Sequence, residues 1–198
     1  MGQSQILANI ILNKITMPFL EASNFDNAWL TIRATTSDNY FDIARWHCDG
    51  YYYFSENSTN SYAGNFKIIA TLRGPQTLII EENNDAKKNL KEKQSEMSLE
   101  RKILIENKNE IEIKKINNEL YKKYRIIIDE TLAKYPKLQL NNNNAIIFMA
   151  GNEERCAIHS EPKFNEDRLF ISIVSGNNND ISEMARLDGY EINTPIHQ

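Results

Sequence analysis

A segment of helical composition, residues 83–134, separates two segments of strand composition and limits the folds open to this chain. This segment is rich in Lys, Glu and Asn and contains neither Gly nor Pro. Mostly apolar side chains recur in it every three to four positions, as on one face of a helix: Ile113, Ile116, Leu120, Tyr124, Ile127 and Thr131. A second helix is expected over about residues 86–105, so the insertion is predicted to form a helical hairpin. Its role stays open between a solvated structural insert and a substrate lid or partner-docking arm.

The segments on both sides of the insertion contain short runs of β-type residues bounded by turn residues. These runs cover residues 29–36, 41–49, 66–72, 77–81, 145–149, 155–159 and 168–174. Gly74-Pro75 lies between two of them, and this turn predicts a hairpin. Many short strands with turns between them favour a sandwich or barrel of jelly-roll type. We therefore expect a mainly β (α+β) fold with this helical insertion, in a single domain over residues 1–198.

The two ends of the chain are expected to be simpler. Residues 3–16 have apolar side chains at helical spacing and predict a short amphipathic helix that packs on the outside of the domain. Residues 175–180 indicate a loop, and residues 181–198 a weakly structured tail.

Composition excludes several classes of function. The net charge of the 198 residues is −4, so no basic surplus points to nucleic acid. No apolar run is long enough to cross a bilayer. Cys48 and Cys156 are too few for a disulfide scaffold, which favours a reduced, cytoplasmic setting and leaves a single disulfide between them open. Gly-rich phosphate loops, Gly-x-Ser-x-Gly and Cys-x-x-Cys patterns are missing from the sequence.

The chemistry is most strongly indicated by His47-Cys48-Asp49, at the end of the predicted strand 41–49. Residues i and i+2 of a strand share one face, so His47 and Asp49 project together and Cys48 points away. One imidazole and one carboxylate are two of the three ligands of a facial metal triad, which needs a second His. His197 is next to the C-terminal residue and is expected to be mobile. The remaining candidate is His159, beside a predicted strand.

Arg168 is a further candidate, because it opens the clearest predicted strand shortly after His159. An organic dicarboxylate that chelates a metal at one end needs a cation at the other, and the planar guanidinium can hold a carboxylate by two hydrogen bonds. The alternative is a surface Arg paired with Glu166 or Asp167.

His47, Asp49, His159 and Arg168 together resemble the iron(II)/2-oxoglutarate dioxygenase superfamily, with its His-x-Asp, distal His and later Arg or Lys. A narrower likeness is to a poorly characterised bacterial family, and it rests on three patches: Arg45 to Asp49, Thr71 to Thr77, and His159 to Pro162. The resemblance implies a double-stranded β-helix that binds iron(II) through the triad and 2-oxoglutarate through Arg168. It also implies hydroxylation or oxidative demethylation, since halogenating members replace the carboxylate ligand with a small residue.

Two other functions remain open at this point. A cupin-like metal-binding protein would use the same ligands for iron, manganese or zinc without 2-oxoglutarate. A non-catalytic interaction protein would present the helical insertion to a partner. The substrate of an enzyme could be a small molecule or a protein side chain. The aromatic run Tyr51 to Phe54 either lines the pocket or packs in the core, and Arg45 and Arg73 are further candidate anion contacts.

Overall fold

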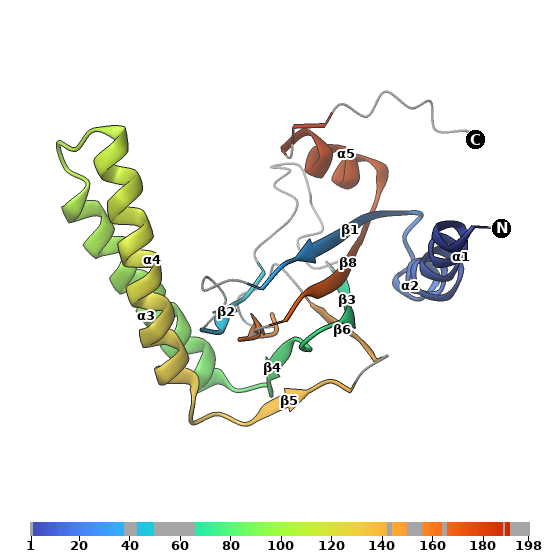
Figure 1. Cartoon of the computed structure of the whole chain (residues 1–198), viewed down its shortest axis with the longest axis horizontal. Helices are drawn as coiled ribbons and strands as arrows, with labels where there is room; N and C mark the ends of the chain where they lie inside the picture. Colours follow the sequence, from blue (N-terminus) through green and yellow to red (C-terminus); the bar gives the residue numbers. More distant parts are fainter. Residues whose placement is uncertain are drawn as a thin grey trace.

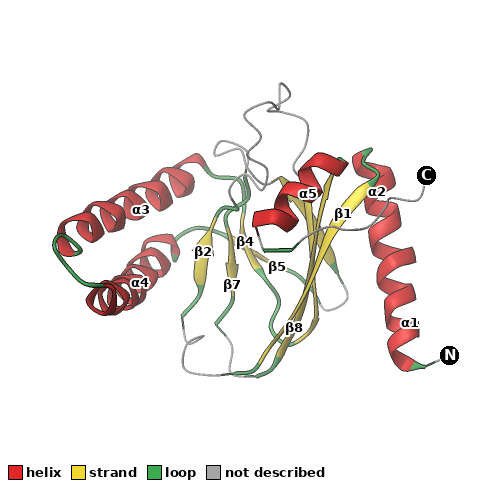
Figure 2. Ribbon diagram, turned by 90° about the horizontal axis from the view of Figure 1, so that it is seen from above, coloured by secondary structure: helices red, strands yellow, loops and turns green. Residues whose placement is uncertain are grey.

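The computed structural model describes residues 2–37, 43–49, 66–141, 144–149, 156–163, 166–187 and 189–190. These residues form a mixed α/β structure with two antiparallel sheets of four strands each, rather than one closed barrel. Figure 2 shows a layered arrangement, with the helices α3 and α4 on one side of the strands and α1 and α2 on the other. None of the described helices is long and apolar enough to cross a membrane.

The larger sheet has the strand order β1-β8-β3-β6. Its strands are β1 (Asn27–Thr35), β8 (Arg168–Gly176), β3 (Phe66–Arg73) and β6 (Ala145–Met149). Alternation along these strands gives the sheet two different faces. Ile68 and Ile173 lie on the outer face and are buried against the N-terminal helix. Lys67 and Val174, which pair in register, lie on the inner face and line a pocket.

The smaller sheet has the order β2-β7-β4-β5. Its strands are short: β2 (Arg45–His47), β7 (His159–Glu161), β4 (Leu78–Ile80) and β5 (Lys137–Gln139). The prediction that 66–72 and 77–81 pair as a hairpin is wrong, because β3 and β4 belong to different sheets. Gly74 has a φ of +83° and follows an irregularity between Thr71 and Arg73, which together turn the chain from one sheet into the other.

The predicted helical insertion is present as α3 (Asn84–Leu104) and α4 (Glu110–Leu132), which lie side by side in Figure 1. The residue before each helix is an Asn whose side chain accepts a backbone hydrogen bond. The Asn before α4, Asn109, forms a capping box with Glu112. Glu100 joins the helices through Lys123 (2.7 Å) and the Tyr124 hydroxyl (2.9 Å). The base of the hairpin packs on the smaller sheet, whereas apolar residues towards its far end are exposed: Leu99, Ile103 and Ile111.

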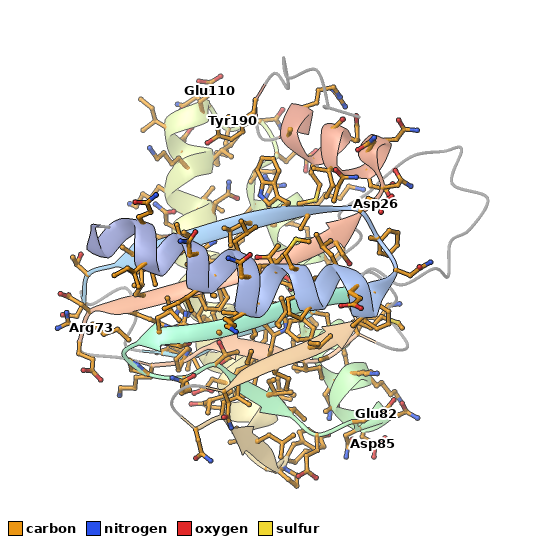
Figure 3. All side chains as sticks on the ribbon, turned by 90° about the vertical axis from the view of Figure 1, so that its right-hand side faces the viewer. Asp26, Arg73, Glu82, Asp85, Glu110 and Tyr190 are labelled. Atoms are coloured by element: carbon orange, nitrogen blue, oxygen red, sulfur yellow. The ribbon has the colours of Figure 1, made fainter. Side chains whose placement is uncertain are left out.

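The N-terminal helical segment is longer than predicted. It runs through α1 (Gln3–Ile10), a π-helical stretch over Ile11–Thr16, and α2 (Met17–Ser23). In Figure 3 this segment lies across the strands of the larger sheet. Phe19 is its main buried anchor and packs with Ile68 and Ile173. The segment therefore covers part of the outer face of that sheet, as predicted for a helix that packs on the outside of the domain.

The prediction of a loop and a weakly structured tail after residue 175 is wrong for part of that region, because α5 covers Asn178–Leu187. The helix begins with a reciprocal cap: the Asn177 side chain accepts from the Asp180 N–H (2.9 Å) and the Asp180 carboxylate accepts from the Asn177 N–H (3.1 Å). Met184 and Ala185 are buried on its inner face. Residues 191–198 of the predicted tail lie outside the described residues, as does His197.

Candidate metal centre

The candidate centre lies between the two sheets, where β2 and β7 meet. These strands pair in register, with His47 opposite His159 and Arg45 opposite Glu161. Arg45 Nη2 lies 2.9 Å from Glu161 Oε1, and Arg33 Nη1 from β1 lies 2.7 Å from the same oxygen. These ion pairs fix the register of the short strands and tie the smaller sheet to the larger one.

The pairing brings the three predicted ligands together. The nearest ligand atoms of His47, Asp49 and His159 all lie within 4.8 Å of one another. His47 Nε2 is 3.7 Å from Asp49 Oδ1, and His159 Nε2 is 3.3 Å from Asp49 Oδ2. The two imidazole ring centres are 4.3 Å apart. One metal ion could therefore reach all three side chains, and the donor set of two nitrogens and one oxygen suits a divalent transition metal.

The backbone orients both imidazoles for this task. His47 Nδ1 lies 3.0 Å from the carbonyl oxygen of Arg45, and His159 Nδ1 lies 3.0 Å from that of Ala157. When each Nδ1 donates its proton to a carbonyl, each Nε2, which faces Asp49, is the nitrogen that a metal ion would bind in place of a proton. The Phe148 ring packs on the His159 ring at 4.7 Å between centres and restricts its rotation. The hydrogen bonds and the packing around the two imidazoles thus fit metal binding, as the three ligands themselves do.

Burial and neighbouring charges keep His47 and Asp49 in the protonation states that bind metal. Burial, followed by the nearby His159 and Arg45, lowers the pKa of His47 from 6.5 to about 3. Burial raises the pKa of Asp49, but the hydrogen bond with His159 and the Lys67 ammonium outweigh it, so the net pKa of Asp49 lies well below its usual range. A neutral imidazole and an ionised carboxylate are the forms that coordinate metals.

Cys48 lies on the opposite face from its two neighbours, as predicted. It packs against the apolar cluster beneath the helical hairpin. Cys48 and Cys156 are both thiols in the structure and are not joined by a disulfide. A hydrogen bond between them and burial raise the pKa of the Cys48 thiol, which keeps it protonated and poorly nucleophilic.

Arg168 lines the same pocket as the three candidate ligands and is 5% exposed. Its Nε donates to the Pro75 carbonyl (3.0 Å), and its Nη2 to the hydroxyls of Thr71 (3.2 Å) and Thr77 (2.8 Å). Its guanidinium lies over the Phe170 ring at 4.6 Å. Burial lowers the pKa of Arg168 to about 10, which leaves it charged at neutral pH.

The alternative of an Arg168 ion pair with Glu166 or Asp167 finds no support, because no carboxylate among the described residues pairs with it. Gly74 shapes its surroundings: a Cβ there would lie 2.6 Å from the Asp167 carbonyl oxygen and 3.1 Å from Arg168 Cα. The Gly74 turn and the start of β8 therefore approach each other closely, which holds Arg168 in its position.

The pocket has a volume of about 400 Å³ and opens to solvent between the sheets. Of the other candidate anion contacts, Arg45 lines the pocket, whereas Arg73 is exposed and is not among the lining residues. Tyr51 to Phe54 lie outside the described residues. No described residue of α3 or α4 lines the pocket, which does not support a lid role for the hairpin.

Sequence reasoning missed three contributors to the pocket. Lys67 contacts Asp49, and Thr71 and Thr77 contact Arg168. Lys67 carried a weak signal, since a lysine inside an otherwise apolar strand is unusual. Comparisons with protein-family models, with curated proteins and with solved structures find no match, so the site is interpreted from its own geometry.

Proposed function

We propose that the chain is an iron(II)- and 2-oxoglutarate-dependent oxygenase built on a double-stranded β-helix. The observation that carries the proposal is that one pocket contains a His-Asp-His cluster and a buried arginine without a carboxylate partner among the described residues. The cluster fits the metal, and the arginine fits the far carboxylate of a chelating dicarboxylate.

The topology supports the fold part of the proposal. In a jelly roll, eight strands wind into two facing sheets so that the first pairs with the last. The strand orders β1-β8-β3-β6 and β2-β7-β4-β5 follow this winding. The candidate ligands come from β2 and β7, two neighbours of one sheet, and Arg168 begins β8 in the other. The two sheets would thus hold the metal and the far end of the cosubstrate on opposite walls.

Iron(II) and 2-oxoglutarate, when bound, would supply the oxidising chemistry: dioxygen is consumed, 2-oxoglutarate leaves as succinate and carbon dioxide, and one oxygen atom goes to the substrate. The chain's residues bind and orient these groups. His47, Asp49 and His159 would hold the metal on one side and leave its other positions for ligands. Arg168, fixed by Thr71 and Thr77, would hold the far carboxylate. Because Asp49 retains a carboxylate, hydroxylation or oxidative demethylation is the proposed outcome.

The experiment is to add iron(II) and 2-oxoglutarate to the apo-protein without oxygen and to measure the weak visible charge-transfer band of the chelate. The wild type should show the band. His159→Ala should abolish it, and Arg168→Ala should raise the 2-oxoglutarate concentration needed about 10- to 100-fold, the value of a charge-assisted contact. Arg73→Ala is the matched control, because Arg73 is exposed and does not line the pocket; it should leave the titration unchanged.

The other results separate the alternatives. Metal binding that depends on His159 without any band would favour a cupin-like protein that does not use 2-oxoglutarate. If no divalent metal binds at all, the enzyme proposal is wrong, and the exposed apolar residues of the helical hairpin become the part of the chain to investigate.

A further inference from the structure

Lys67 is a buried cation in direct contact with a candidate metal ligand. It is the second residue of β3, and its Nζ lies 2.7 Å from Asp49 Oδ2. Both side chains are 12% exposed. Its register partners, Phe148 on β6 and Val174 on β8, are apolar, so the strand environment does not favour an ammonium at this position. A buried ion pair is often no more stabilising than well-packed apolar side chains, so the presence of Lys67 against Asp49 points to a role at the site rather than in stability.

The contacts of Asp49 show what Lys67 would do beside a metal. Oδ2 contacts both Lys67 Nζ (2.7 Å) and His159 Nε2 (3.3 Å), whereas Oδ1 faces His47 Nε2 (3.7 Å). The ammonium and the imidazole nitrogens therefore surround one carboxylate. A divalent ion bound by this carboxylate and the two imidazoles would share Asp49 with Lys67. Two positive centres on one carboxylate repel each other through a partly desolvated space.

The repulsion is relieved if the ion also carries an anionic ligand. The pocket as a whole is biased towards anions, because four cationic side chains line it with two carboxylates: Arg33, Arg45, Lys67 and Arg168, with Asp49 and Glu161. Arg33 and Arg45 already share Glu161. Lys67 is the cation placed against the ligand cluster itself, and a negative ligand on the ion would approach it.

We propose that Lys67 is a positioning residue that makes the metal and an anionic chelating ligand bind cooperatively. Without metal, its ammonium holds Asp49 and opposes binding of the bare ion. With metal, it stabilises the negative end of the chelating ligand, at the opposite end from Arg168. The inference rests on the proposed function only in that the three ligands bind a divalent ion; it does not require 2-oxoglutarate or turnover.

The experiment uses cobalt(II) followed by oxalate, both titrated into the full chain and measured by visible absorption. Oxalate is a chelating dianion that has no distal carboxylate, so its binding tests Lys67 apart from Arg168. Lys67→Met removes the charge and keeps most of the length of the side chain. We expect cobalt(II) alone to bind about 10-fold more tightly to this variant, and oxalate to bind its cobalt complex about 10- to 100-fold more weakly. Lys67→Arg should restore most of the oxalate affinity.

A control makes the result specific. Lys163→Met, at an exposed position outside the pocket lining, removes a lysine charge and should change neither titration. A purely structural role of Lys67 would weaken cobalt and oxalate binding together, and that result would overturn the inference. Unchanged affinities in Lys67→Met would also overturn the inference. A 2-oxoglutarate band in the wild type would still support the proposed function in that case. Opposed shifts in cobalt and oxalate affinity, without a 2-oxoglutarate band in the wild type, would support the proposed role of Lys67 and contradict the proposed oxygenase function.

Discussion

The two faces of the smaller sheet are built from alternate residues of the same short strands, and they differ in almost every respect. Trp46 packs in the apolar cluster under the helical hairpin, whereas His47 and its register partner His159 face the larger sheet and line the pocket. The first face packs on the buried apolar side of α4, which includes Leu120, Tyr124, Ile128 and Leu132. The second face presents imidazoles and a carboxylate to a pocket.

The comparison shows how strands of three residues can hold the candidate metal ligands in place. A strand this short has few ladder hydrogen bonds, so it needs another source of rigidity. The apolar face supplies it, because Trp46 is buried among α4 side chains and its Nε1 donates to Asp129 Oδ1 at 2.7 Å. The hairpin therefore acts as a support for the candidate ligands, although none of its described residues lines the pocket.

The largest expected effect comes from breaking the apolar face. Trp46→Ala should lower the free energy of unfolding by about 3–5 kcal/mol, because it removes a large buried side chain and leaves a cavity under α4. Urea denaturation of the apo-protein measures it. Trp46→Phe is the matched control: it keeps most of the packing, loses the bond to Asp129, and should cost about 1–2 kcal/mol. A loss below 1 kcal/mol in Trp46→Ala would show that the hairpin does not support the sheet.

The polar face should make the free energy of unfolding of the apo-protein depend on pH. His47 titrates near pH 6.5 in an unfolded chain and near pH 3 in the folded one. Between these values the unfolded state binds more protons, so the free energy of unfolding falls as the pH is lowered from 7 to 4. We expect His47 to account for a loss of about 2–3 kcal/mol, with Asp49 acting in the same direction below its ordinary value of 3.8.

The measurement is urea denaturation at several pH values without metal. His47→Gln removes the titrating imidazole, and the variant should lose that part of the slope between pH 7 and 4. An identical slope in the variant and the wild type would mean that His47 is not held neutral by burial, and the described geometry of the polar face would be wrong.

The polar face was also the more predictable of the two. Alternation on a strand placed His47 and Asp49 on one side and Cys48 on the other, and the small number of histidines selected His159. Strand alternation is a local property, so it can be inferred without knowing the partner strand. Helical periodicity is equally local, and the hairpin of α3 and α4 was predicted close to its observed limits.

What the sequence did not indicate depends on contacts between distant residues. Lys67 contacts Asp49 only because the fold places β3 opposite Asp49 across the pocket. The separation of β3 and β4 into two sheets follows from pairing with β8, β6 and β7, which no local pattern specifies. The helix α5 was missed because Asn177 and Asp180 lie in an Asn-rich segment that indicates a loop, although the same two residues form its cap. β5 has only three residues, too few for a periodic signal.

The smallest expected effect comes from Ser160, the register partner of Trp46 on β7. Ser160 is fully buried, and its hydroxyl has no hydrogen-bond partner within the described part of the chain. Ser160→Ala should therefore be neutral or should raise the free energy of unfolding by up to about 1 kcal/mol, since it removes an unsatisfied buried group. Strand alternation points the Ser160 and His159 side chains to opposite faces of β7, so cobalt(II) affinity should stay unchanged although Ser160 is among the residues around the pocket. A destabilised variant would reveal a partner for this hydroxyl, and a change in metal affinity would mean that the two faces of β7 are not independent.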